Sequence, residues 1–166
     1  MSRGFVREGD QEEMPYVAPR AFLPPGVTNY VTQVGLDELL AEKEELIQEK
    51  GQFENHNEND RRVAINHINA KLQLLQERIN SARVINLNDQ PQDEIRFGAT
   101  VELIMEKTGE VQILQITGVD EANISNGKLS FVSPLAKVLN NKRTGDKVKF
   151  RRPDGEVLYC IAKVSY

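Results

Sequence analysis

One stretch of the chain repeats apolar residues at alternating steps of three and four. These residues form an unbroken seam over almost three heptads: Ile65, Ile68, Leu72, Leu75, Ile79 and Ala82. On an α-helix this spacing places them along one narrow side, which must be covered by a second helix. The stretch therefore predicts one helix of a coiled coil, and residues 32–85 have room for two.

The partner helix is predicted immediately upstream, where a less regular seam runs through Leu36, Leu39, Leu40, Lys43, Leu46, Ile47, Lys50 and Phe53. When the two seams are paired antiparallel, residues 53, 46, 39 and 36 face 65, 72, 79 and 82, and each pair of numbers adds to 118. The turn then falls near residue 59, within residues 55–60, which are rich in Asn and Asp. Their side chains bond nearby backbone groups and favour turns. We expect an antiparallel coiled-coil hairpin over residues 31–86.

Residues 1–30 hold four of the seven prolines and show no lasting periodicity. Proline fixes φ and removes an amide donor, so this stretch is expected to be neither a helix nor a central strand. We interpret it as an extended tail that is disordered unless it docks. Its start lacks the apolar core of a signal peptide, and no apolar run approaches the roughly 18 residues of a membrane span, so a cytoplasmic protein is expected.

The period changes in residues 95–166. Strands are predicted over 99–106, 111–117, 147–150 and 156–164, a hairpin at Asn126-Gly127, and a short helix over 135–139 capped by Ser133. These elements predict an α+β fold: the helical hairpin, a linker over 87–94, and a domain over 95–166 with a four- to five-stranded antiparallel sheet and one short helix. Cys160, which alternates with Leu158 and Ala162, is expected in the core.

Charge divides the chain in the same way. Residues 1–94 carry 10 basic and 17 acidic residues, a net of −7, whereas residues 95–166 carry 11 and 8, a net of +3. The basic residues cluster between 137 and 152, where only Asp146 opposes them, and the expected basic patch comprises Lys142, Arg143, Lys147, Lys149, Arg151 and Arg152. Such a patch can bind nucleic acid or an acidic protein surface, and the charges alone do not indicate which of the two.

Few residues are available for catalysis or metal binding. A single cysteine excludes a disulfide framework and a cysteine-based zinc site. Two histidines leave little for a histidine metal site or a Ser-His-Asp triad.

The most distinctive run is Ser133-Pro134-Leu135-Ala136-Lys137, followed by Leu139, Lys142, Gly145, Asp146 and Val148. It resembles the C-terminal signature of the Gre family of bacterial transcription elongation factors, GreA and GreB. Upstream, Val31-Thr32-x-x-Gly35-Leu36 resembles that family's opening of the first coil helix, and residues 82–85 resemble its exit from the second. The resemblance covers residues 31–166 and leaves out the proline-rich tail.

This resemblance implies a coiled coil joined to an FKBP-like domain. The coil would enter the secondary channel of RNA polymerase, and the C-terminal domain would dock at the channel rim through Ser133, Pro134, Leu135, Ala136 and Lys137. Two acids at the coil tip would help the polymerase hold a second Mg²⁺, so that a backtracked transcript is cut. The factor would be a monomer with no catalytic site, cofactor or metal of its own, and would meet the nucleic acid of the elongation complex only indirectly.

The tip departs from the family pattern of an Asp, two residues and a Glu-Asn pair. Counting back from Val84 without gaps places Glu54-Asn55 on that pair and Gly51 on the Asp, whereas the coil register puts Glu58-Asn59 at the turn. The candidate tip acids are therefore Glu54, Glu58 and Asp60. Each arm also looks shorter than in GreA, by roughly two helical turns or about 11 Å.

Two rival functions remain. The first is a channel-binding regulator of the same fold that does not stimulate cleavage, which the altered tip and short arms favour. The second is a peptidyl-prolyl isomerase, because the C-terminal fold would be FKBP-like. That activity needs an aromatic-lined pocket, and residues 95–166 supply few aromatic residues for one: Phe97, Phe131, Phe150, Tyr159 and Tyr166.

Overall fold

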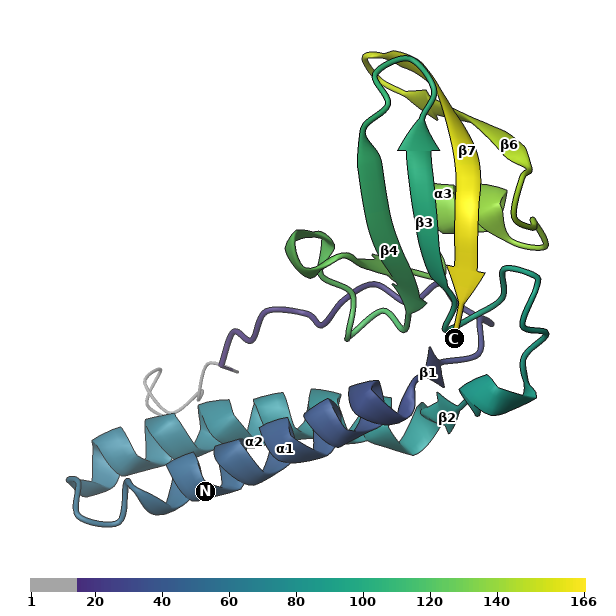
Figure 1. Cartoon of the computed structure of the whole chain (residues 1–166). Coiled ribbons are helices and arrows are strands. Elements are labelled where there is room, and N and C mark those ends of the chain that lie inside the picture. Colours follow the sequence, from purple (N-terminus) through teal and green to yellow (C-terminus); the bar gives the residue numbers. More distant parts are fainter. Residues whose placement is uncertain (1–14) are drawn as a thin grey trace, which may run out of the picture.

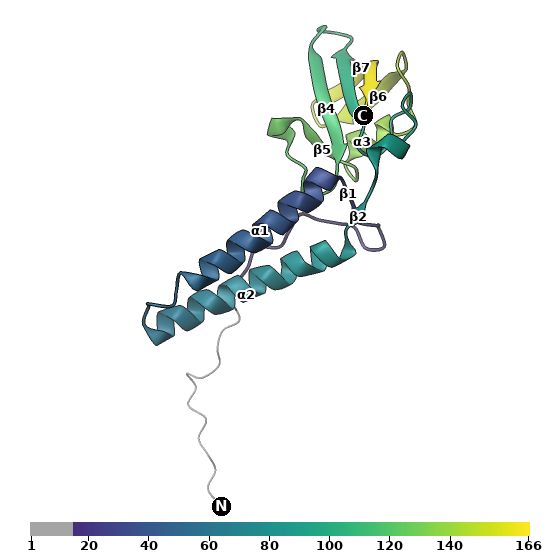
Figure 2. The same cartoon turned by 60° about the horizontal axis from the view of Figure 1, so that its bottom comes forward.

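The computed structural model describes residues 15–166, and the part of the predicted tail over residues 1–14 lies outside them. Two long helices, α1 (Gln33–Gly51) and α2 (Glu58–Ser81), lie side by side as an antiparallel hairpin that projects from a small sheet domain (Figures 1 and 2). The predicted α+β architecture is confirmed. No helix in the described part of the chain is long and apolar enough to cross a membrane.

The hairpin is held by the predicted seam. Leu39, Leu46, Ile68 and Leu75 are buried together between the helices. Two hydrogen bonds cross from α1 to α2: Lys43 Nζ donates to Gln76 Oε1 at 2.8 Å, and Lys50 Nζ donates to Asn69 Oδ1 at 2.9 Å. The residue numbers of each bonded pair add to 119, so the predicted register is correct to within one residue.

The turn lies earlier than residue 59. The backbone N–H of Asp60 donates to the Asn57 side-chain oxygen at 2.9 Å, which makes Asn57 the N-cap of α2. This cap satisfies an amide that the first helical turn would otherwise leave unpaired, so α2 begins at Glu58. The two helices are therefore joined by residues 52–57.

At the base of the hairpin, β1 (Tyr30–Val31) runs parallel to β2 (Arg83–Val84), which directly follows α2. The Thr32 side chain caps α1 by accepting from the Gly35 amide at 2.9 Å. A short 3₁₀ helix, η1 (Leu87–Asp89), lies in the predicted linker.

The sheet domain has five strands in the order β5-β4-β3-β7-β6. Along the chain these are β3 (Thr100–Met105), β4 (Val111–Thr117), β5 (Lys128–Ser130), β6 (Lys147–Arg152) and β7 (Gly155–Ser165). Three of the four pairings are antiparallel, but β5 pairs with β4 in parallel. Asn126-Gly127 therefore does not join two hairpin strands: it ends the 3₁₀ helix η2 (Ile124–Asn126), and Gly127 takes the left-handed conformation.

The predicted short helix is α3 (Pro134–Leu139), and its buried Ala136 and Leu139 pack in the core of the sheet domain. The prediction for Cys160 is wrong, because its neighbours Tyr159 and Ile161 are the fully buried residues and Cys160 is only half-buried. The cause is a β-bulge. Along β3, Glu102 pairs with Lys163 but Leu103 pairs with Ile161, which leaves Ala162 unpaired and reverses the inward alternation.

Residues 15–29 form neither helix nor strand, as predicted. They run through the angle between the hairpin and the sheet domain, in purple in Figure 1. Here the segment contacts α2, where the Arg78 side chain donates a hydrogen bond to the Ala21 carbonyl. We call residues 15–29 the strap.

Candidate functional site

The three predicted groups of site residues lie on different parts of the molecule. The tip acids are at the free end of the hairpin, Ser133–Lys137 lie at α3 beside the hairpin base, and the basic run lies around edge strand β6.

At the tip, Glu54 lies in the connecting turn, and Glu58 and Asp60 lie in the first turn of α2. All three side chains are exposed. The Asp60 carboxylate accepts a hydrogen bond from the Asn57 amide, which ties it into the helix cap. Within residues 15–166 no three acidic, histidine or cysteine side chains gather closely enough to hold a metal ion. The exposed carboxylates of Glu54 and Glu58 can approach a metal on another molecule.

Around α3 the predicted contact residues divide into two kinds. Ser133 is the N-cap, and its hydroxyl accepts from the Ala136 amide at 3.3 Å, while Ala136 itself is buried. These two side chains build the helix. Pro134 and Lys137 are exposed and Leu135 is half-buried, so these three can meet a partner.

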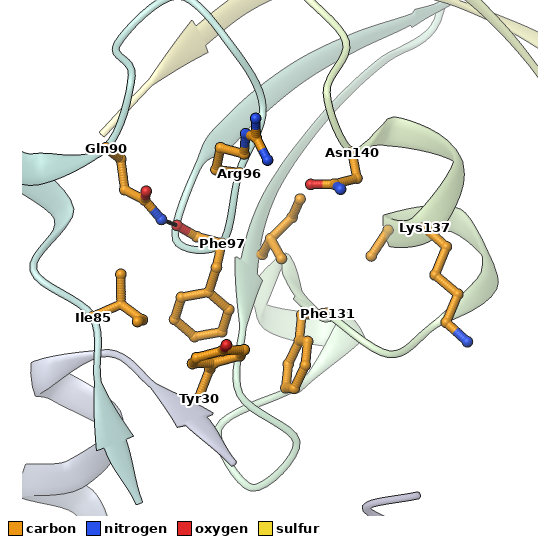
Figure 3. A pocket seen from close by; sticks show the side chains of 10 residues that line it. Tyr30, Ile85, Gln90, Arg96, Phe97, Phe131, Lys137 and Asn140 are labelled. Atoms are coloured by element: carbon orange, nitrogen blue, oxygen red, sulfur yellow. Dashed lines mark hydrogen bonds between the residues drawn. The ribbon is translucent and has the colours of Figure 1, made fainter. Parts of the chain in front are cut away.

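A cavity of about 450 Å³ opens beside α3, between the hairpin base and the sheet domain (Figure 3). Its floor is made by the rings of Tyr30, Phe97 and Phe131, whose centroids lie 5.5–5.9 Å apart. Edge-on contacts at this spacing stabilise aromatic clusters. The other lining residues are Ile85, Gln90, Arg96, Ile116, Ala136, Lys137 and Asn140. Sequence reasoning missed this cavity, because it considered the aromatic residues of 95–166 alone and Tyr30 comes from the hairpin base.

Arg96 at the cavity edge is held by the last residue of the chain. The Tyr166 hydroxyl accepts from the Arg96 amide at 2.8 Å and donates to the Glu94 carbonyl at 2.7 Å. Burial raises the pKa of Tyr166 above its usual value of 10.0. The Arg96 guanidinium pairs with Glu94 at 3.3 Å, while its buried Nε has no hydrogen-bond partner among residues 15–166.

The basic run is partly neutralised by acids outside it. Arg143 pairs with Asp93 at 2.6 Å, Lys147 with Glu106 at 2.7 Å, and both Lys149 and Arg151 lie within 4.0 Å of Glu156. The hydrogen bond to Glu106 raises the pKa of Lys147. Arg152 donates to the Tyr159 hydroxyl at 3.1 Å, and Lys142 is half-buried. The surface is therefore less positive than the local count suggests.

Comparison with known proteins places the sheet domain in a family. Residues 90–166 match the family model "Transcription elongation factor, GreA/GreB, C-term". The chain is 38% identical over 103 residues to the transcription elongation factor GreA of Bartonella henselae and 35% identical over 99 residues to that of Maricaulis maris. These alignments cover 62% and 60% of this chain and 66% and 63% of the relatives, just under two thirds of their length.

Among solved structures, GreA factor homolog 1 (Gfh1) of Thermus thermophilus is 21% identical to this chain, with a TM-score of 0.41 over 84% of this chain and 100% of that one. A GreA/GreB factor from Nitrosomonas europaea is 19% identical, with a TM-score of 0.43 over 82% of this chain and 98% of that one.

Proposed function

Because the chain belongs to the GreA/GreB family, we propose that it is a transcription elongation factor that binds bacterial RNA polymerase. The sheet domain docks at the rim of the secondary channel and the hairpin enters the channel. Two features support this proposal: the family match covers the sheet domain, and the hairpin projects from that domain as an arm (Figure 2). α1 has 19 residues and α2 has 24, so the arm extends for about 28–36 Å at 1.5 Å per residue.

We further propose that the factor occupies the channel with little stimulation of transcript cleavage. The tip carries this part of the proposal. A second Mg²⁺ in the polymerase site requires oxygen ligands delivered together. Asp60 is tied to the Asn57 cap. Glu54 in the connecting turn and Glu58 on α2 do not have the spacing of the family's Asp and Glu-Asn pair.

A transcript-cleavage assay on backtracked elongation complexes tests this proposal. We expect the wild-type factor to bind the complex, to release little cleaved RNA, and to slow cleavage by a cleavage-competent Gre protein in competition. Robust cleavage that is lost on Glu54→Gln or Glu58→Gln would show instead that the tip acids suffice. Absence of binding to polymerase would contradict the whole proposal.

The docking surface can be tested in the full chain. Lys137→Glu reverses the charge of an exposed residue on α3 at the cavity edge, and we expect it to weaken polymerase binding by at least tenfold. Lys163→Glu makes the same change at another exposed lysine of the sheet domain and should leave binding within twofold. Equal effects of the two substitutions would indicate that only net charge matters.

One observation favours the prolyl isomerase as a second candidate: the cavity at the hairpin base is lined by three aromatic rings. A proline ring packs well on such surfaces. However, the rings contact one another, and Tyr30 comes from outside the sheet domain. A standard peptide isomerisation assay with Phe131→Ala as control decides the matter, and acceleration that the variant loses would support the isomerase.

A further inference from the structure

The strap links three segments of the chain at one point. The Arg20 guanidinium donates two hydrogen bonds to the Glu42 carboxylate of α1, at 2.8 and 3.0 Å, and a third from Nε to Asp120 Oδ1 at 3.0 Å. Asp120 belongs to the loop that follows β4. A single strap residue therefore connects the hairpin to the sheet domain.

The second helix joins the same cluster. Arg78 of α2 places Nε 3.2 Å from Asp120 Oδ2, in an ion contact without hydrogen-bond alignment, and donates a hydrogen bond to the strap carbonyl of Ala21. The cluster contains two cations and two carboxylates, so its charges balance. Because the Asp120 side chain is only 8% exposed, its contacts with the two arginines are weakly screened by salt. The bidentate hydrogen bond to Glu42 raises the pKa of Arg20, which stays charged.

A separate contact joins the two parts at the hairpin base. The Thr32 hydroxyl donates to Glu121 Oε2 at 2.6 Å, and Lys128 pairs with the other Glu121 oxygen at 3.2 Å. The backbones also approach closely there: a Cβ added at Gly118 would lie 2.6 Å from the Tyr30 carbonyl oxygen. Lys128 also lies 3.8 Å from the Glu38 carboxylate of α1. These contacts hold the first turns of α1, and the Arg20–Glu42 contact lies further along the helix.

We infer that the strap sets the direction of the hairpin relative to the sheet domain, with Arg20 as its fastening residue. Glu42 lies ten residues beyond Thr32, about 15 Å along α1 at 1.5 Å per residue. A second attachment at that distance from the first restricts the swing of the arm about its base. The inference goes beyond the proposed function and does not depend on it, since the direction of the arm is a property of the free protein.

Distances between two spin labels on the full-length protein test this inference. Cys160→Ala removes the native cysteine, and Gln52→Cys at the tip and Lys107→Cys at the far end of the β3–β4 turn provide exposed label sites. We expect one narrow distance distribution. Arg20→Ala should at least double its width, and Arg20→Lys, which keeps the charge but loses the planar fork, should have an intermediate effect.

Two further variants separate the fastening from a general effect of altering the strap. Asp120→Asn should broaden the distribution at least as much as Arg20→Ala, because it weakens the Arg20 contact and also the ion contact with Arg78. The double variant should add little to Asp120→Asn, because either change breaks the connection through Arg20. Phe22→Ala alters a strap side chain that is 74% exposed and should leave the width unchanged. An unchanged width in Arg20→Ala, with the helical circular dichroism of the wild type, would overturn the inference, as would equal broadening by Phe22→Ala.

Discussion

Replacing Leu75 by alanine should destabilise the hairpin strongly. Its side chain is fully buried, at 0% exposure, in a cluster with Leu39, Leu46 and Ile68. The substitution removes three buried carbons and leaves a cavity between two long helices that cannot collapse without bending. Leu-to-Ala changes at such positions cost about 3–4 kcal/mol, of which the lost transfer free energy accounts for roughly 2 and the cavity for the rest.

Leu40 provides a matched control, because the same substitution there removes the same atoms from a side chain that is 45% exposed on α1. Its cost should stay below about 1 kcal/mol, since little apolar area returns to water and alanine is the better helix former. The measurement is chemical unfolding followed by circular dichroism at 222 nm, which reports on the helices. Similar costs for Leu75→Ala and Leu40→Ala would refute the burial of Leu75 between the helices and with it the hairpin register.

Two more substitutions test the hairpin base and the cavity edge. Gly118→Ala places a Cβ 2.6 Å from the Tyr30 backbone oxygen and should cost about 1–3 kcal/mol in thermal unfolding, whereas Gly51→Ala meets nothing within 4 Å and should be neutral or stabilising. Equal effects would contradict the close approach. Tyr166→Phe removes two hydrogen bonds and should cost about 1–2 kcal/mol. Because burial raises the pKa of Tyr166, the folded state favours the protonated phenol. Its contribution is complete below the ordinary pKa of 10.0 and is lost as the pH rises through the higher folded value, so the alkaline decline in stability should be shallower in Tyr166→Phe. An identical decline in both proteins would contradict this assignment.

The hairpin could be predicted because its information is local. A 3–4 spacing of apolar residues marks the seam within each helix, and two such seams joined by a short turn can pair in only one antiparallel register. The turn itself was placed a few residues late, because the cap that starts α2 depends on Asn57 rather than on the seam. The α3 start was equally local: a serine cap followed by proline defines it within three residues.

In β7, which contains Cys160, the alternation of apolar residues does not predict which side chains are buried. Leu158, Cys160, Ala162 and Val164 alternate as an inward face would, and Val164 does pack against the core. The bulge at Ala162 shifts the pairing by one residue, so the inward positions before it are Tyr159 and Ile161. A bulge is a property of two paired strands, and only the pairing with β3 reveals it.

The charges show the same limit on a larger scale. Read along the sequence, the run near β6 is opposed by Asp146 alone, but in the fold Asp93, Glu106 and Glu156 add three negative charges beside it. Conversely, Arg20 stands in a proline-rich stretch with no sign of structure, and its partner Asp120 lies 100 residues away. An ion pair between distant residues leaves no periodic pattern in the sequence. The sequence alone therefore does not indicate which of the 25 acidic residues pairs with Arg20. Asp120 pairs with Arg20 because of the contact at the hairpin base. There Thr32 binds Glu121, and the adjacent Asp120 is held where Arg20 of the strap reaches it. The strap runs through the angle between the hairpin and the sheet domain (Figure 1). The base contact thus forms the site to which the strap fastens, and loosening the base should also release Arg20.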